Sequence, residues 1–426
     1  MKKFSLEYPR LTPLWIAVFV DILGFSIILP FLPFFIEEFK TSPFVIGLLL
    51  SSNAIFGFFF GPILGKLSDI YGRKPLLLIS QAGTIVGFVL LALSTNIQML
   101  FIARIVDGIF GGQFPISKAV IGDIVPPQER PKQMTNIGVT FTLAFLIGPA
   151  IGGSLSSFGI IGPAILASIL ALFTFSFTAI FLKESLPTKV GEELLLTLDK
   201  KSPSNITKSK DLKSNDNNLS IWKNKTAVIL LIQYSLLAFV AGVFQTTFSL
   251  FGAIRLNLNA QTIGFLLSAM GIFQVVFRTF VFNRMRNYLG DPKTAMIGLG
   301  SFILAYFLLG FVMEVWQLII VLFYISFCGA TSRGITIGFT SRAVDFRNQG
   351  KIMGITSSLD NLSQILGPLL GGILLSISNG YIFGIVLSTL SIIPFMISFQ
   401  VLKLGFDNRK SLKTQIPNSP DIKIKV

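Results

Sequence analysis

Residues 46–56 read IGLLLSSNAIF and residues 263–273 read IGFLLSAMGIF, so that seven of the eleven positions are identical at an offset of 217. A second pair of segments, GPAIGG at 148–153 and GPLLGG at 367–372, matches at an offset of 219. Two matches in the same order and at nearly the same spacing indicate an internal duplication. The chain therefore consists of two similar halves.

The composition is that of a protein that faces lipid. Of the 426 residues, 52% are hydrophobic and only 13% are charged, and the mean hydropathy is +0.74. These values argue strongly against a soluble enzyme. The sequence has no His and a single cysteine, Cys328, which removes imidazole bases, His-metal sites and an internal disulfide. We therefore expect no catalytic residue, no metal and no cofactor.

Twelve stretches are apolar over a length of about 20 residues, which is what a helix needs to cross the hydrocarbon layer. They are residues 12–36, 44–64, 75–94, 97–118, 134–157, 161–183, 225–252, 260–281, 294–313, 315–335, 353–377 and 380–402. Because six spans per half is an even number, both halves run in the same direction through the membrane. The predicted fold is an all-α membrane protein with twelve transmembrane helices in two parallel-repeat six-helix halves.

The chain divides into an N-terminal six-helix half, a cytoplasmic linker, a C-terminal six-helix half and a cytoplasmic tail. The predicted boundaries are 1–183, 184–224, 225–406 and 407–426. The linker is rich in Lys, Ser, Asn and Asp and has little hydrophobic periodicity.

Basic residues set the predicted orientation. With both termini in the cytoplasm, the outer loops and the outer end of the first span hold only Lys40 and Arg255. Apart from four basic residues within or at the ends of spans, all others then lie on the cytoplasmic side, as the positive-inside rule requires. The net charge of +15 is thus explained by loops beside anionic lipid, with no nucleic-acid partner. We expect a multi-pass protein of the plasma membrane.

A motif of small and charged residues, GKLSDIYGRK, occupies residues 65–74 between the second and third spans. We interpret it as a loop, in which Gly65 and Gly72 permit a tight turn. Asp69 would lie near a helix start, where the helix dipole favours an acid. Arg73 and Lys74 would remain in the cytosol.

Three further motifs lie within predicted spans of the first half. Span 12–36 contains an acid followed by glycine and two prolines, span 97–118 contains RIVDGIFGG at 104–112, and span 134–157 contains GPAIGG. Their glycines and prolines, with the equivalent residues of the second half, mark places where helices pack closely or bend. These residues are Gly24, Pro30, Pro33, Gly148, Pro149, Gly152, Gly153, Gly367, Pro368, Gly371 and Gly372.

Together, the four motifs resemble those of the major facilitator superfamily, and most of all the tetracycline-resistance-like branch of its twelve-span drug:proton antiporters. The resemblance covers nearly the whole chain and is sharpest in the first half. It implies a secondary-active transporter that exports a small organic molecule in exchange for protons, by alternating access to a site between the halves. It also implies that Asp69 helps to lock a cytoplasmic gate. Two positions depart from the family pattern, Ile70 in the loop motif and Ala144 before GPAIGG.

Asp21 lies near the middle of the first span. A charged group at that depth costs about 2.5–3.5 kcal/mol on insertion scales and therefore faces a wet cavity or a partner. Desolvation disfavours the charged form of a carboxyl, so its charge can switch with access to water. Asp21 is the first candidate for the proton carrier, and the alternative is a structural ion pair with a neighbouring Arg.

Other charged residues within the spans are secondary candidates. Arg104 and Asp107 are three residues apart on one helix face, so they form either a local salt bridge or a switching partner for Asp21. Asp360 in span 353–377 is a further candidate for cation or proton binding. Arg333 lies near the predicted cytoplasmic end of its span, where we expect it to snorkel to the interface.

Two other functions remain open on the sequence. A symporter or facilitator for a sugar or organic acid would share the fold. A non-transporting receptor or membrane enzyme would need a large ligand-binding domain or clustered catalytic groups, whereas the outer loops are short and the acids within the spans are scattered. The expected partners are a small-molecule substrate, protons and the lipid bilayer, and an architecture of two halves can act as a monomer.

Overall fold

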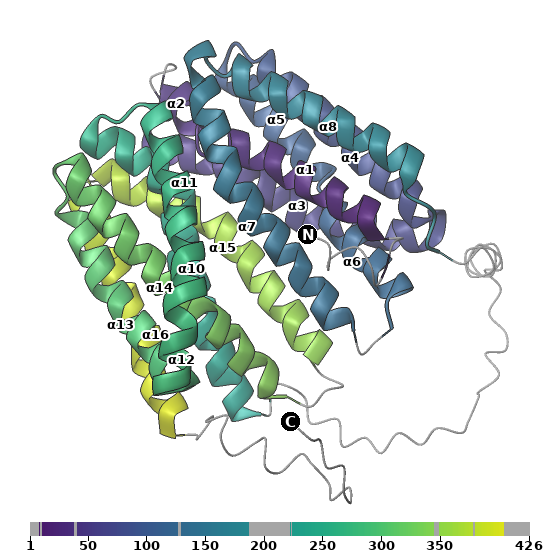
Figure 1. The fold of residues 1–426 in the computed structure, drawn as a ribbon. Helices are drawn as coiled ribbons and strands as arrows, with labels where there is room; N and C mark the ends of the chain where they lie inside the picture. Colours follow the sequence, from purple (N-terminus) through teal and green to yellow (C-terminus); the bar gives the residue numbers. More distant parts are fainter. Residues whose placement is uncertain are drawn as a thin grey trace, which may run out of the picture.

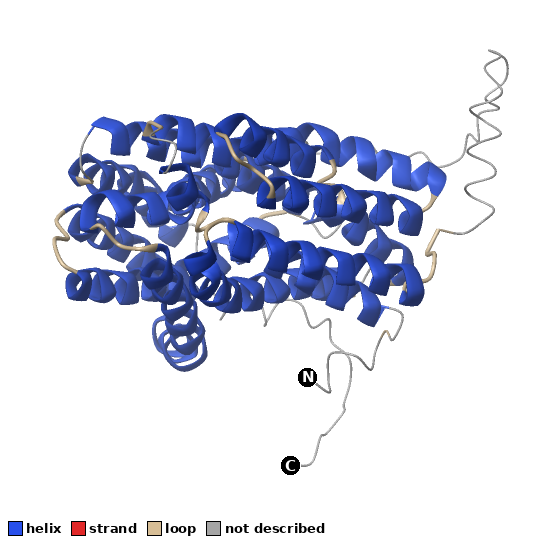
Figure 2. Ribbon diagram, turned by 90° about the horizontal axis from the view of Figure 1, so that it is seen from above, coloured by secondary structure: helices blue, strands red, loops and turns tan. Residues whose placement is uncertain are grey.

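The computed structural model describes residues 8, 11–37, 41–126, 129–186, 222, 224–344, 349–377 and 380–403. Over these residues the chain is helical and contains no strand (Figure 2). The prediction of an all-α fold is confirmed. Most of the predicted linker, 184–224, and all of the predicted tail, 407–426, lie outside the described residues.

The helices fall into two sets along the chain (Figure 1). The first set is α1 (Thr12–Ile28), α2 (Leu32–Glu37), α3 (Pro43–Tyr71), α4 (Arg73–Ala92), α5 (Ile97–Ile109), α6 (Gln113–Ile124), α7 (Arg130–Leu155), the short η2 (Ser156–Phe158) and α8 (Ile161–Phe181). The second set is α10 (Lys225–Leu256), α11 (Ala260–Val276), the π-helical η4 (Phe277–Phe282), α12 (Asn283–Leu289), α13 (Asp291–Gly310), α14 (Val315–Arg342), α15 (Gln349–Ile377) and α16 (Tyr381–Lys403).

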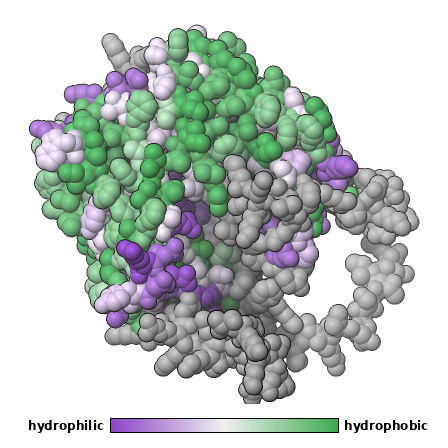
Figure 3. Space-filling view, in the orientation of Figure 1, coloured by the Kyte–Doolittle hydropathy of each residue, from purple (hydrophilic) through white to green (hydrophobic). Residues whose placement is uncertain are grey.

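Eleven helical stretches within the described residues are long and apolar enough to cross a membrane. Hydrophobic side chains cover most of the helical surface visible in Figure 3. The protein is therefore an integral, multi-pass membrane protein. The helix outside these eleven is α15, which is 29 residues long but includes Asp360, Asn361 and Gln364. The exact number of twelve spans stays a prediction.

Two predicted spans are broken rather than continuous. Span 12–36 is divided into α1 and α2 at Leu29–Phe31, where Pro30 lacks the N–H that a helix needs. Span 97–118 is divided into α5 and α6, because the chain makes a tight turn in which Gly111 N–H donates to the Gly108 carbonyl at 3.0 Å. Each stretch is still a single membrane-spanning segment, Thr12–Phe34 and Ile97–Ile124, and the break at Pro30 lies where a bend was expected.

The predicted loop at residues 65–74 is also wrong, because α3 continues to Tyr71 and α4 begins at Arg73. Only Gly72 connects them, with a φ of +100° that favours glycine. Asp69 therefore lies in the last turn of α3 and not near a helix start. The dipole opposes a carboxylate at that position, so Asp69 depends on a nearby cation.

The two helix sets pack by the same rule. In the first set α1 packs against α7 and α8, and α4 packs against α8. In the second set α10 packs against α15 and α16, and α13 packs against α16. These helices correspond along the duplicated sequence, so the packing repeats with it. Figure 1 shows the two sets as neighbouring groups of helices.

The two sets meet through α3 against α15 and through α7 against α11. The duplicated motifs supply both contacts. A methyl group on Gly47 would lie 2.3 Å from the Pro368 carbonyl oxygen, and one on Gly264 would lie 2.4 Å from the Pro149 carbonyl oxygen. Only glycine permits backbones to approach this closely. We call this end of the bundle the glycine end, and the opposite end, where α3 and α12 finish, the basic end.

The other predicted packing residues line the same seams. Gly148 and Gly152 pack against α1, and Gly367 and Gly371 pack against α10. Gly153 lies against α11 of the second set, and Gly372 lies against the start of α3 in the first set. Gly24 makes only ordinary contacts. Helices α7 and α15 remain continuous through Pro149 and Pro368.

Replacing Gly47 by Val should force the two sets apart at the glycine end. Overpacking of this kind costs about 1–3 kcal/mol, which is roughly tenfold in an equilibrium. The reporter is Ser51→Cys, because Ser51 is buried and its hydroxyl donates to the Ile365 carbonyl across this seam at 2.7 Å. Maleimide labelling of this cysteine should accelerate roughly tenfold when Gly47→Val is added. The native Cys328 is fully buried and gives little background.

The matched control is Gly354→Val, since a Cβ on Gly354 meets nothing within 4 Å. Equal labelling rates for Gly47→Val and Gly354→Val would show that the glycine contact does not hold the halves together.

Candidate functional site

Asp21 lies in α1 and is enclosed by the helices of the first half. Its neighbours are Gln81 on α4 and Thr174 on α8. Its Oδ1 atom is buried and has no hydrogen-bond partner among the described residues. The charged residue whose field reaches Asp21 is another acid, Asp107. Among the residues that the structure describes, no arginine lies against this carboxyl.

Arg104 and Asp107 form a local pair on α5. Nη1 of Arg104 lies 3.4 Å from Oδ2 of Asp107, and the Asn53 amide of α3 donates to the same oxygen at 2.8 Å. Both charged residues are almost fully buried, and the Arg104 guanidinium lies 5.8 Å from the centre of the Phe88 ring. Its Nε and Nη2 atoms have no hydrogen-bond partner within the described chain. The pair is thus incompletely satisfied.

Asp360 belongs to a second cluster, in the second half. The Tyr234 hydroxyl of α10 lies 2.9 and 2.8 Å from the two carboxylate oxygens and donates to them. Nη2 of Arg333, on α14, lies 3.4 Å from Oδ1. Arg333 is therefore not simply directed toward the interface, as expected from its position, but reaches Asp360. The nearby cation from the first half is Lys118 of α6, which feels the charge of Asp360.

At the basic end, Arg73 binds two carboxylates of the first half. Its Nη2 lies 2.5 Å from Asp69, its Nε lies 3.0 Å from Asp123, and its Nη1 donates to the Ser68 hydroxyl at 2.7 Å. Arg73 is only 7% exposed. This pairing supplies the cation that Asp69 needs at the end of α3, and it joins α3, α4 and α6.

Glu184, just after α8, caps the start of α4. Its carboxylate accepts the backbone N–H of Arg73 at 2.9 Å and that of Lys74 at 3.0 Å. Burial acts to raise the pKa of Glu184, but the N–H groups of Leu186, Arg73, Lys74 and Ser185 hold it below its usual value. The ammonium of Lys74 donates to the Ala179 carbonyl of α8 at 2.6 Å. The turn around Gly72 is therefore fixed from both sides.

The second half has the same arrangement with the charges exchanged. Asp291, which is 4% exposed, lies between Arg286 at 2.6 Å and Arg342 at 3.0 Å. Compared with Asp69, Arg73 and Asp123, these three residues are offset by 217, 218 and 219 positions. The triad is not visible as a match between similar residues, because each charge is replaced by its opposite. A search for opposite charges at the repeat spacing finds it.

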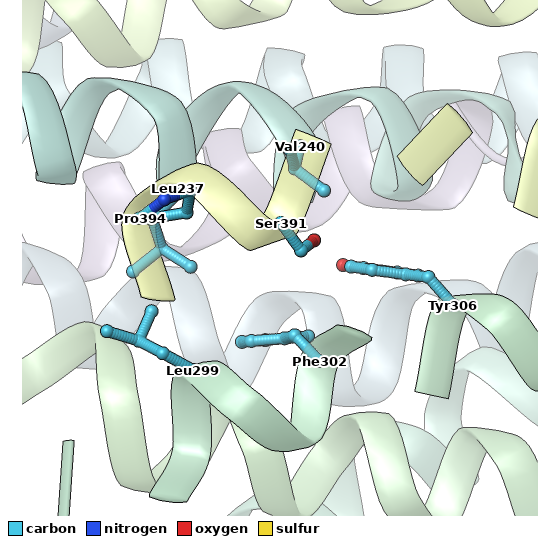
Figure 4. Close-up of a pocket in the computed structure, with 7 residues that line it drawn as sticks. All are labelled: Leu237, Val240, Leu299, Phe302, Tyr306, Ser391 and Pro394. Carbon is cyan, nitrogen blue, oxygen red and sulfur yellow. The ribbon is translucent and has the colours of Figure 1, made fainter. Parts of the chain in front are cut away.

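A small enclosed space separates α10, α13 and α16 in the second half (Figure 4). It is lined by Leu237, Val240, Leu299, Phe302, Tyr306, Ser391 and Pro394. The Tyr306 and Ser391 oxygens point toward each other across it (Figure 4), and Gln233 donates to the Pro394 carbonyl at 2.9 Å. The space has no room for a water molecule, so it is a packing seam rather than a substrate site.

Comparison with known proteins agrees with this arrangement. The chain is 29% identical to the tetracycline resistance protein, class H, of Pasteurella multocida over 94% of this chain and 97% of that protein. It is 27% identical to multidrug resistance protein 2 of Bacillus subtilis (strain 168), over 86% of this chain and 88% of that protein. These similarities confirm the predicted resemblance to the tetracycline-resistance-like branch.

Solved structures and the family profile extend the comparison. The crystal structure of the human organic anion transporter MFSD10 (TETRAN) superposes with a TM-score of 0.65 and 22% identity, covering 92% of this chain and 99% of that one. A peptide transporter POT complex superposes with a TM-score of 0.71 and 13% identity, covering 93% and 94%. Both likenesses concern the fold. The profile of the Major Facilitator Superfamily matches residues 14–279 and 230–420, and the chain belongs to that family.

Proposed function

We propose that this protein exports a small organic molecule, of the drug-like class named for its relatives, in exchange for protons. The support for export comes from the similarity to tetracycline and multidrug resistance proteins. The support for proton coupling comes from Asp21. Asp21 has a buried carboxyl oxygen without a hydrogen-bond donor or a neighbouring cation among the described residues. That observation carries the proton-coupling part of the proposal. Transport of this kind involves no covalent step on the protein.

The proposed organisation follows the predicted one. Residues 1–183 and 225–406 form the two moving halves, 184–224 links them in the cytoplasm, and 407–426 is a cytoplasmic tail. The protein lies in the plasma membrane, and both termini are on its cytoplasmic side. The repeated packing of the two helix sets supports this division, and the basic residues support the orientation. One chain contains both halves, so a monomer suffices for the cycle.

Alternating access then takes place about the contacts between the halves. The glycine end faces outward, where Gly47, Gly264 and the two prolines hold the halves together. The ion pairs of the basic end join helices within each half and leave the halves free to separate toward the cytoplasm. In the opposite state the basic end closes and the glycine contacts part. The triad of the first half has one excess acid and that of the second half one excess base, so their fields favour this closure.

Asp21 couples this movement to protons. A carboxylate enclosed without a cation is costly, whereas the same group in contact with water is well solvated. Movement of α1 against α4 and α8 therefore changes the preferred charge of Asp21. Asp107 and Arg104 lie nearby as the pair that adjusts when this charge changes. Each pH unit of gradient supplies about 1.4 kcal/mol per proton for export.

Replacing Asp21 by Asn should abolish export driven by a pH gradient while the protein still inserts and folds. An amide of the same shape cannot take up and release a proton, so the drop should be at least about 100-fold. The measurement is substrate flux in proteoliposomes with an imposed pH gradient. Glu314→Gln removes a carboxylate from a helix N-cap outside the bundle interior and should leave the flux unchanged.

Undiminished gradient-driven export by Asp21→Asn would remove Asp21 from the coupling. The same assay distinguishes the alternative function, because a symporter would accumulate substrate on the side to which protons flow. The similarity to efflux proteins favours the opposite sense of transport.

Replacing Arg73 by Gln should destabilise the gate region. Removing one partner of a buried ionic network costs about 3–5 kcal/mol, because it leaves like charges together. The free energy of unfolding should be partly restored when Asp123→Asn is added, since the second change removes one of the two facing acids. Thermal unfolding of the single and double variants measures this. Simple addition of the two losses would contradict the proposed network.

A further inference from the structure

We infer that the space between the halves at Lys118 and Arg333 is a recognition site for the acidic group of a flat aromatic substrate. The inference rests on the proposed transport function and names the class of molecule that this chain would carry. It depends on three observations: a pair of cations from opposite halves, a shared acid that is already occupied, and a row of aromatic rings beside one of the cations.

The charged groups come from both halves. Lys118 belongs to α6 of the first half, and it lies within Coulombic range of Asp360 on α15 of the second half. Arg333 reaches the same carboxylate from α14. Lys118 and Asp360 therefore interact from one half to the other, and we place the cluster at the space between the halves. This is where a transporter of two repeats binds its substrate.

The cluster has more positive than negative charge. Its single acid, Asp360, accepts two short contacts from the Tyr234 hydroxyl, whereas Arg333 approaches it only at 3.4 Å. Lys118 has neither a hydrogen bond nor an ion pair within the described residues. An ammonium with three donors is thus left without a direct acceptor. The site has one acid and two cations, so it attracts an anion and repels a cation.

A row of phenylalanines lies beside Lys118. Phe114 precedes Lys118 by four residues and therefore shares its face of α6. Its ring stacks on Phe141 of α7 with centroids 5.1 Å apart, Phe141 stacks on Phe145 at 5.8 Å, and Phe145 meets Phe25 of α1 at 6.4 Å. All four side chains are half-buried, and Phe114, Phe141 and Phe145 pack with one side against the core of the first half. Flat aromatic groups bind such rings by stacking.

The register of α7 turns this row toward the second half. Phe141 and Phe145 are spaced by four residues from Pro149, whose carbonyl contacts Gly264 of α11. The other side of α7 has the exposed Leu143 and Ile147, at 39% and 42%, which is the side suited to lipid. The phenylalanines therefore line the space between the halves. A ring on this row would place an attached acidic group within reach of Lys118.

The test uses three probes that share one ring and differ in charge: 2-naphthoate, 2-naphthamide and 2-naphthylmethylammonium. Their affinities for the full-length protein in nanodiscs of uncharged lipid are measured by equilibrium dialysis without any pH gradient. We expect naphthoate to bind more tightly than the other two. Lys118→Gln and Arg333→Gln should each weaken naphthoate binding about tenfold and change naphthamide binding by less than about twofold. Lys118→Arg should retain the affinity.

Two further variants complete the design. Asp360→Asn should tighten naphthoate binding about tenfold, because it removes the competing acid, and a gain in affinity cannot come from misfolding. Lys293→Gln removes an exposed positive charge at the start of α13 and should leave binding unchanged. The naphthoate measurement uses no pH gradient, whereas the coupling assay requires one, so failure of proton coupling and failure of this site are separate results.

The inference is overturned if Lys118→Gln binds naphthoate like the parent protein, or if naphthylmethylammonium binds more tightly than naphthoate. It is also overturned if Lys118→Gln weakens all three probes equally, since that result would indicate a packing role for the lysine.

Discussion

Two close backbone contacts hold this protein in its present arrangement. Gly47 against Pro368 and Gly264 against Pro149 bring α3 to α15 and α11 to α7 at distances that no larger residue permits. In lipid, helices gain little from hydrophobic burial against each other, so small residues that allow close packing govern association. Both contacts lie at one end of the bundle, so they join the halves there, and in the proposed mechanism the halves separate at the other end. The remaining features of the molecule follow from this asymmetry.

The charged residues also differ between the two ends of the bundle. At the basic end, each half has its own triad, with Arg73 between two acids in one and Asp291 between two arginines in the other. These triads stabilise each half as a rigid unit, so that neither depends on the other at that end. Deeper in the bundle, Asp21 has no cation, while Lys118 and Arg333 approach a single acid from opposite halves. Asp21 thus lies within the first half, whereas the cluster around Asp360 brings together charged residues of both halves.

The sequence predicted the main architecture because hydrophobic length and duplication are global signals. The repeat at 46–56 and 263–273 contains Gly47 and Gly264, whose contacts between the halves became apparent only in the structure. Local breaks were harder to predict. Residues 110–112 lie in an apolar stretch that periodicity cannot divide. Residues 65–71 include charged residues yet remain helical, because Arg73 of α4 pairs with Asp69 at that end of α3.

Apart from the Arg104–Asp107 pair on α5, the partners of the charged residues could not be predicted from spacing. Tyr234 and Asp360 are 126 positions apart in sequence, and only the packing of α10 against α15 brings them together. The triad of the second half was present in the sequence, but a search for similar residues does not detect acids that are replaced by bases and bases that are replaced by acids. This replacement preserves the ion pairs although it changes all three residues of the triad.

The most direct test of the account is to measure both ends of the bundle at once in the same protein. Spin labels at Thr95 and Met313 report on the glycine end, and labels at Lys66 and Lys293 report on the basic end, with distances read by double electron–electron resonance as the pH is lowered. We predict that one distance lengthens while the other shortens, and that Asp21→Asn abolishes this dependence on pH. Two distances that change in the same sense, or that respond to pH equally in Asp21→Asn, would contradict it.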